Sequence, residues 1–222
     1  MDQSTDKKVE EIQQHIVFGI SGKAQAGKDT LAEHIRDSLA PEIFDVHIIH
    51  MADELKRICR SMFGFTDHQL NTIEGKNSLS HLSWSDLPYR RDKSSFMKVR
   101  EVLEEVGTTF FRGLDPDCHL NSVETRIKEL LFQSTDRIPV FLVPDIRETN
   151  EISSILRMGG ANIRLARNTE NRQTPIETAL DALEPEDFDY YIDNTHMTVQ
   201  EKNQEGLDYF LSFVNRKLKT EK

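Results

Sequence analysis

A short apolar run that leads into a glycine-bounded turn is the feature that most restricts how this chain can fold. Residues 15–21 are β-branched and apolar at successive positions, which is typical of a strand buried on both faces. Residues 22–27 interrupt this run. From Lys28 onward, apolar residues fall on one face of a helix that ends before Pro41: Leu31, Ala32, Ile35 and Leu39. The sequence therefore predicts a strand, a glycine-bounded loop and a helix in direct succession.

The same alternation continues along the rest of the chain. Further strands are expected at 46–51, 139–144, 162–166 and 190–192. Further helices are expected at about 55–64, 96–107, 119–133, 152–158 and 198–217. Strands that alternate with helices favour a parallel sheet that is covered on both faces. We therefore expect an α/β fold of three layers, with a mostly parallel sheet of about five strands.

The length of the chain favours one domain. At 222 residues it is well below twice the common domain size, and we see no repeat, linker or low-complexity segment. Residues 1–14 are polar and lack periodicity, so we interpret them as a flexible tail. A single domain is expected over 15–222, and the polar stretch 65–95 is expected to be an insertion within it.

The charge balance excludes some classes of partner. Lysine and arginine number 28 and aspartate and glutamate 38, which gives a formal net charge of −10. Nucleic-acid polymers and membrane surfaces favour a basic excess, so neither is expected to bind. Cys59 and Cys118 are too few for a disulfide framework or a cysteine-only zinc site. Because the start is polar and no apolar run approaches 18 residues, we expect a soluble, cytoplasmic protein.

The loop itself has the pattern of a phosphate-binding site. Residues 22–28 fit G-x-x-x-x-G-K, and Asp-Thr follows. Glycines let backbone N–H groups approach a phosphate, the helix directs its positive end at it, and the lysine adds a mobile cation. The alternative, a surface turn with a chance lysine, is rare when a buried strand precedes the pattern. We therefore expect a P-loop NTPase fold that binds the phosphates of a nucleotide, which the resemblance described below identifies as ATP, through these residues: Gly22, Lys23, Ala24, Gln25, Ala26, Gly27, Lys28, Asp29 and Thr30.

Two aspartates are candidates for binding magnesium. Asp29 occupies the place where the broader motif has a Ser or Thr, and a carboxylate could hold the metal through water. Asp145 follows the apolar run 139–144, where doubly wound sheets place ligand groups. Capping of the following helix is the alternative for each. Thr30 can donate its hydroxyl to an inner phosphate.

Further motifs follow the loop in order. Residues 27–30 read Gly-Lys-Asp-Thr. Behind them come 51–56, Arg100 with Leu103, 107–108 ahead of Arg112, 143–147 with 150–151, 159–160 leading to 163–167, and 177–181 followed by 188–194. In this order and spacing, over roughly residues 15–205, the chain resembles the phage-type deoxynucleoside monophosphate kinase family of the P-loop nucleoside-monophosphate kinase group. The Gly-Lys-Asp-Thr form of the loop is typical of that family.

The resemblance implies a reaction in which ATP, with Mg²⁺, phosphorylates a deoxynucleoside monophosphate to the diphosphate. Catalytic roles are then expected for Lys28, Asp145, Arg147 and Arg112. Arg167 would bind ATP, in a short lid at about 167–187. The 65–95 insertion would bind the acceptor, and the residues expected to contact it are Asp53, Lys56, Trp84, Arg91, Arg100, Arg112 and Arg147.

Several alternatives stay open. Each arginine could instead be a solvated surface charge, Arg147 could form an ion pair with Glu148 or Glu151, and Trp84 could pin its loop to the core instead of stacking on a base. The acceptor could be another small phosphate-bearing molecule, of the dephospho-coenzyme A or phosphomevalonate type. A nucleotide-binding regulator without activity is the alternative outside enzymes. The preferred base and the formation of a homodimer are not determined by the sequence.

Overall fold

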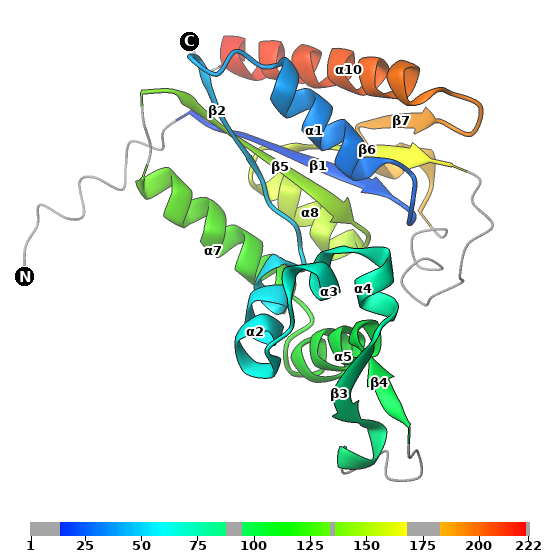
Figure 1. The fold of residues 1–222 in the computed structure, drawn as a ribbon. Helices are drawn as coiled ribbons and strands as arrows, with labels where there is room; N and C mark the ends of the chain where they lie inside the picture. Colours follow the sequence, from blue (N-terminus) through cyan, green and yellow to red (C-terminus); the bar gives the residue numbers. More distant parts are fainter. Residues whose placement is uncertain (1–13, 88–94, 134–135, 168–182, 221–222) are drawn as a thin grey trace, which may run out of the picture. The chain divides into compact units, whose positions relative to one another are not determined.

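A five-stranded parallel sheet forms the centre of the first part of the molecule (Figure 1). This computed structural model describes residues 14–87, 95–133, 136–167 and 183–220. The described residues form two compact units, one of which comprises the chain up to His50 and from Val123 onward, and the other Met51–Ser122. Each unit is described by itself. The single domain expected over 15–222 stays a prediction.

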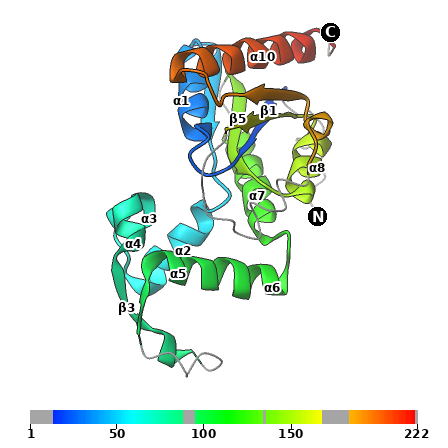
Figure 2. The same ribbon diagram turned by 90° about the vertical axis from the view of Figure 1, so that its right-hand side faces the viewer.

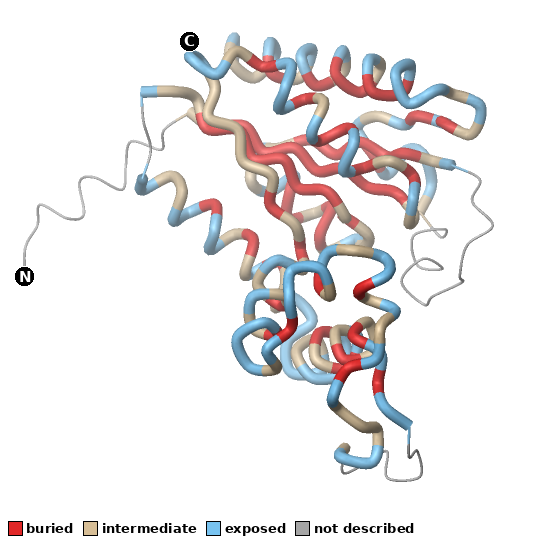
Figure 3. Tube along the Cα trace, viewed as in Figure 1, coloured by how far each residue is buried: buried red, intermediate tan, exposed pale blue. Residues whose placement is uncertain are grey.

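The sheet of the first unit has the strand order β2-β5-β1-β6-β7, and every neighbouring pair is parallel. Its strands are β1 (Ile16–Gly22), β2 (Phe44–Ile48), β5 (Ile138–Ile146), β6 (Ala161–Ala166) and β7 (Tyr190–Asp193). The central strand β1 is buried at all seven positions, as its apolar sequence predicts (Figure 3). Along β1 and β5, Ile16 pairs with Val140 and Ile20 with Pro144.

Helices cover both faces of this sheet and complete the three layers (Figure 2). On one face lie α1 (Lys28–Ser38) and α10 (Val199–Thr220); on the other lie α8 (Thr149–Arg157) and α7 (Cys118–Phe132), whose first residues belong to the second unit. The rings of Phe18 and Phe210 meet edge to face, 5.1 Å between centroids, and join β1 to α10. The expected three-layer α/β fold with five parallel strands is thus confirmed.

The second unit is built mainly from short helices around its own apolar cluster. Its elements are α2 (Asp53–Phe63), α3 (Asp67–Asn71), α4 (Ile73–Asn77), the antiparallel pair β3 (Leu79–Ser83) and β4 (Phe96–Lys98), α5 (Val99–Glu104), a π-helical segment (Glu105–Phe111) and α6 (Arg112–Leu114). The buried cluster comprises Leu55, Cys59, Phe65, Leu70, Met97, Val99 and Val102. This unit therefore has a small core separate from that of the sheet.

The largest differences between the expected and the observed elements are at the second strand, the stretch 65–87 and Phe96–Lys98. The second strand begins at Phe44, which pairs with Ile138, and ends before the predicted 51. The stretch 65–87 is not loop: Thr66 and Thr72 accept N–H bonds from the first turns of α3 and α4 and so begin two helices. Phe96–Lys98 is a strand because it pairs with β3, and helix α5 starts only at Val99. Within the described residues no helix combines the length and apolar character needed to cross a membrane.

Candidate active site

The predicted loop connects β1 to α1 and turns sharply at its glycines. A side chain at Gly22 would place its Cβ 2.8 Å from the carbonyl oxygen of Leu165, so only glycine fits beside β6. Gly27 adopts φ 88° and caps the N-terminus of α1, and Gln25 has φ 64°. Such left-handed values are favourable for glycine and uncommon for other residues. The expected strand, loop and helix are therefore present, and the loop lies at the positive end of α1.

Lys28 bends back across the loop that it terminates. Its ammonium donates to the carbonyl oxygen of Lys23 (2.9 Å) and lies 3.1 Å from Oδ1 of Asp145. The side chain is only 5% exposed. Burial lowers the pKa of Lys28, and the neighbouring Asp145 carboxylate opposes that effect. The ammonium is thus held at the end of the sheet by one carboxylate and one carbonyl.

Asp145 is an extra residue in β5. The register passes from Ile20–Pro144 directly to Ser21–Ile146, so Asp145 bulges out of the ladder, with φ 73°. Burial by itself would raise its pKa, but the cations of Lys28 and Arg147 lower it to about 2. Oδ1 accepts a hydrogen bond from the Arg147 guanidinium at 3.3 Å. A positive φ at a non-glycine residue, as at Asp145, is uncommon and occurs often at functional sites.

Glu151 fixes the turn that follows Asp145. Its carboxylate, 2% exposed, accepts the backbone N–H groups of Arg147 (2.7 Å) and Glu148 (3.2 Å). The N-cap residue of α8 is Glu148, so Asp145 does not cap that helix. The guanidinium of Arg147 forms its ion pair with Asp145, not with Glu148 or Glu151 as the alternative proposes. Glu151 contacts Arg147 through the backbone N–H of Arg147.

Asp29 faces His50. Both residues belong to the unit that contains the five-stranded sheet. Nε2 of His50 lies 3.1 Å from Oδ1 of Asp29, and this hydrogen bond is the main cause of the lowered pKa of Asp29. The negative charge of Asp145 acts on Asp29 in the opposite direction, so the two carboxylates influence each other. In the first turn of α1, Asp29 is 65% exposed and available to a ligand.

The donor set is consistent with Mg²⁺ held jointly by protein and phosphate. Among the described residues no group of three or more His, Cys, Asp or Glu could hold a metal alone. Magnesium is commonly bound through one or two carboxylates together with substrate phosphates. Asp29 and Asp145, both ionised beside the loop, supply such a pair.

A cavity of about 360 Å³ lies beside the loop on the side of α10. Apart from loop residues 25–30, it is lined by Arg167, Asn194, Met197, Thr198, Val199 and Lys202. Arg167, predicted to bind ATP, therefore does lie next to the loop. Asn194 donates to the carbonyl oxygen of Ala26 (2.9 Å), and Lys202 contacts Gly27 and Thr30. Lys202 was not predicted, because a lysine in a polar helix has the pattern of a surface charge.

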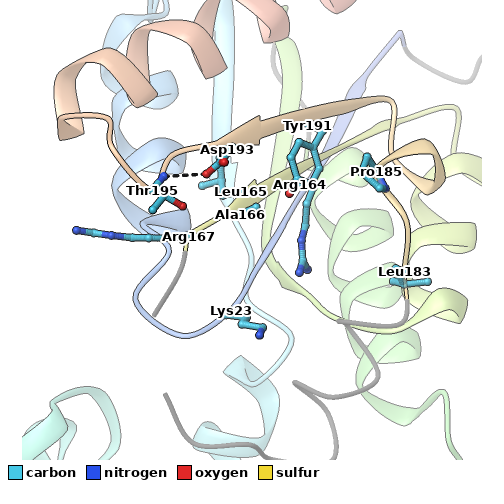
Figure 4. Close-up of a pocket in the computed structure, with 10 residues that line it drawn as sticks. All are labelled: Lys23, Arg164, Leu165, Ala166, Arg167, Leu183, Pro185, Tyr191, Asp193 and Thr195. Atoms are coloured by element: carbon cyan, nitrogen blue, oxygen red, sulfur yellow. Dashed lines mark hydrogen bonds between the residues drawn. The ribbon is translucent and has the colours of Figure 1, made fainter. Parts of the chain in front are cut away.

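A second cavity, of about 300 Å³, also has Arg167 in its lining (Figure 4). Lys23, Arg164 and Arg167 bring three positive charges to it, and Asp193 brings a carboxylate that accepts the N–H of Thr195 (3.0 Å). Arg164, 7% exposed, lies 5.6 Å from the centroid of the Phe188 ring. Its Nη1 donates to Oγ of Ser21, directly before the loop (3.4 Å). Both cavities next to the loop are thus lined by several cations, although the chain as a whole is acidic.

The residues expected to bind the acceptor lie mainly in the second unit. Asp53 and Lys56 are on α2, Arg100 is on α5, and Arg112 follows the π-helical segment. Within the part of this unit that the structure describes, Nε of Arg100 is buried and has no hydrogen-bond partner. Trp84 packs against the apolar cluster, as the alternative to base stacking requires. Arg91 and most of the expected lid, 168–182, lie outside the described residues.

The π-helical segment Glu105–Phe111 precedes Arg112 directly. Gly107 lies inside it, and a Cβ there would be 2.6 Å from Cδ2 of Leu55, so the segment packs closely on α2. Segments of π-helix are rare and occur often at functional sites. The assembly of Arg100 and Arg112 with Lys28 into one site stays a prediction.

No protein-family model matches this sequence, and no curated protein does. Solved structures with a similar course of the chain include that of APE1195 (13% identity, TM-score 0.49, 90% of this chain and 97% of that one). The tunicamycin resistance protein of Deinococcus radiodurans is 13% identical, with TM-score 0.43, over 89% and 96% of the two chains. Thymidylate kinase from Candida albicans is 12% identical, with TM-score 0.45, over 92% and 93%. With TM-scores below 0.5, these resemblances identify no family for the chain.

Proposed function

We propose that the protein is a P-loop kinase that transfers the γ-phosphoryl group of ATP to a deoxynucleoside monophosphate. The observation that carries this proposal is the cluster of Lys28, Asp145 and Arg147 beside the loop, joined by contacts of 3.1 and 3.3 Å. In doubly wound sheets ligands bind at the carboxyl ends of the strands, which is where β1 and β5 bring these residues.

Electrostatics explains why such a site needs local cations. Donor and acceptor are both anions, and the transition state spreads negative charge over the transferred oxygens. A chain with net charge −10 repels them unless positive groups line the site. Lys28 would exchange its bond with the Lys23 carbonyl for the outer phosphates, and the planar guanidinium of Arg147 suits bidentate binding of a phosphate.

The reaction requires no strong general base. A phosphate monoester has a second pKa near 6, so the attacking oxygen of the acceptor is already largely ionised at neutral pH. Asp145, with a pKa of about 2, is ionised as well and poorly suited to accept a proton. Its role would be to hold Lys28 and Arg147 in position before the phosphates arrive.

Asp29 and Asp145 are the residues that would hold Mg²⁺, because both carboxylates lie near Lys28 and influence its charge. Bound there, the metal would neutralise part of the charge on the phosphates of ATP. The hydrogen bond with His50 would keep Asp29 oriented and ionised for this purpose.

The cavity beside Asn194 would take the nucleoside part of ATP, with Arg167 at its edge. The acceptor would bind residues of the second unit. Nε of Arg100 supports this: it is buried and has no hydrogen-bond partner among the described residues, and such a donor destabilises a protein until a ligand satisfies it. The choice of a deoxynucleoside monophosphate rests on the motif resemblance. Arg91 and the lid 167–187 keep their expected roles as part of the same proposal.

A coupled assay with ATP and each of the four deoxynucleoside monophosphates tests the function. Turnover of at least one is expected, together with its loss in Lys28→Met. Lys128→Met, at an exposed site on α7, is the matched control and should leave turnover unchanged. Near-normal turnover in Lys28→Met would refute the role of the loop.

The same assay separates the rival functions. Turnover restricted to dephospho-coenzyme A or phosphomevalonate would show a kinase with a different acceptor. Binding of ATP, measured by a shift in melting temperature, without turnover of any acceptor would indicate a regulator that has lost activity.

A further inference from the structure

Lys202, on the C-terminal helix α10, reaches the phosphate loop from a distant part of the sequence. Its ammonium donates to the carbonyl oxygen of Gly27 (2.6 Å) and to Oγ1 of Thr30 (2.7 Å). The residue is 2% exposed. Lysine is almost never buried to this extent without a charged partner. A buried ammonium so close to the loop therefore calls for an explanation.

Lys202 has no carboxylate partner among the residues that the structure describes. Its two acceptors are neutral oxygens of α1 and its cap, and the charged group that acts on it is Arg167, at the end of β6, which has the same sign. A buried cation that lacks a counter-ion is destabilising. An anion in the adjoining cavity, which Lys202 and Arg167 both line, would supply the missing negative charge.

The hydrogen bonds of Thr30 indicate where that anion would lie. Its hydroxyl proton is donated to the Gly27 carbonyl (2.8 Å), while its oxygen accepts from Lys202. If the Thr30 hydroxyl donates its hydrogen bond to a phosphate instead, the carbonyl oxygen of Gly27 still accepts a hydrogen bond from Lys202. The Lys202 ammonium then lies next to Oγ1 of Thr30 and thus close to the phosphate. Its positive charge and the negative charge of the phosphate attract strongly in a partly buried site.

Two further contacts, one made by the residue after β7 and one by α10 itself, join this part of the chain to the loop and α1. Asn194 donates to the carbonyl oxygen of Ala26 (2.9 Å), and Asn203 donates to that of Thr30 (3.3 Å). Gly206 lies so close to α1 that a Cβ there would meet Leu31 at 2.6 Å. The position of the Lys202 ammonium is therefore set by packing on both sides of it.

We propose that Lys202 is a second cation of the polyphosphate site, supplied by the C-terminal helix, and that it binds the phosphate nearest the nucleoside while Lys28 binds the outer ones. This inference rests on the proposed binding of ATP or ADP and adds a binding residue that the sequence motifs do not contain.

Burial first, and the Arg167 charge second, lower the pKa of Lys202 to about 8. An anion bound against the ammonium would raise this pKa again, because it favours the charged form. At about pH 8 the free site is then only partly protonated, and binding takes up a fraction of a proton. Burial also lowers the pKa of Lys28, so the share of the uptake that belongs to Lys202 is given by the difference between the wild type and a variant at position 202.

Calorimetric titration of the full chain with ADP, without metal, in two buffers of different ionisation enthalpy tests the proposal. We expect proton uptake by the wild type near pH 8 and clearly less by Lys202→Arg, which keeps its charge and most of its affinity. Lys202→Met is expected to bind ADP at least tenfold more weakly. Lys219→Met, at an exposed site on the same helix, should behave as the wild type.

The outcomes separate the two levels of the proposal. Wild-type protein that does not bind ADP would overturn the proposed function and this inference with it. ADP binding with no proton uptake, or with equal uptake in Lys202→Arg, would overturn the role of Lys202 alone. If Lys202→Met does not fold, as judged by circular dichroism, the comparison of wild type with Lys202→Arg still decides.

Discussion

The Lys28 ammonium lies 3.1 Å from the carboxylate of Asp145, and Asp145 is the residue at which β5 shifts its register with β1. The bulge releases the Asp145 side chain from the alternation of the strand and turns it toward the loop. The lysine that would bind phosphate is thus oriented before any ligand arrives, which lowers the cost of ordering it on binding.

Asp145→Asn is expected to lower kcat by about 100-fold or more, because the charge that positions Lys28 and Arg147 is lost. Asparagine tolerates the left-handed backbone at this position, so the fold should persist. Steady-state kinetics measures the effect, and Asp136→Asn, at an exposed site, is the control. A variant with at least half the normal kcat would show that Asp145 has no part in the reaction.

The lowered pKa of Asp145 also predicts how stability depends on pH. A carboxylate whose folded pKa is about 2, against an ordinary 3.8, stabilises the protein above the ordinary value and loses that contribution as the pH falls. The free energy of unfolding of the wild type should exceed that of Asp145→Asn by a constant amount above about pH 5, and the difference should shrink below about pH 4. Urea unfolding at several pH values measures it. A difference that does not change with pH would contradict the ion pair.

Gly22→Ala should destabilise the fold by about 1–3 kcal/mol, because its Cβ would collide with the Leu165 carbonyl in the neighbouring strand. Gly113→Ala has open space around it and should be neutral. Gly64→Ala, in open space but at φ 69°, isolates the cost of backbone conformation. The denaturant midpoint is expected to be lowest for Gly22→Ala and highest for Gly113→Ala. Equal midpoints for these two variants would exclude close packing at the loop.

Arg100→Met is expected to raise KM for the acceptor at least tenfold and to leave KM for ATP unchanged. Because Nε of Arg100 is buried and no residue that the structure describes accepts its hydrogen bond, the variant should be at least as stable as the wild type in the absence of ligand. Arg57→Met, which removes an exposed arginine of the same unit, is the control for both measurements. A loss of stability with no change in KM would assign Arg100 a structural role.

The sequence predicted those parts of the site that depend on short-range patterns. Strand β1, the loop and Lys28 follow one another directly, and each has a clear local signal. Phe96–Lys98 was misassigned because three residues carry no reliable period, and only the pairing with β3 makes them a strand.

The contribution of Lys202 could not be predicted in the same way. Its contact with Thr30 joins residues 172 positions apart, and nothing local distinguishes it from the solvated lysines of α10. The bulge at Asp145 is also invisible in the sequence, because it depends on the register between β1 and β5. The division of the described chain into two units arises likewise from contacts between distant segments.

The attachment of α10 to the loop has a consequence for synthesis of the chain. Residues 22–30 leave the ribosome early, but the side chains that secure their carbonyls come from 194, 202 and 203. A nascent chain that stops before these residues has the glycines and Lys28 but lacks the side chains that bind the loop carbonyls. If the loop binds ATP as proposed, this ability would be complete only late in synthesis, when the last helix docks on the loop.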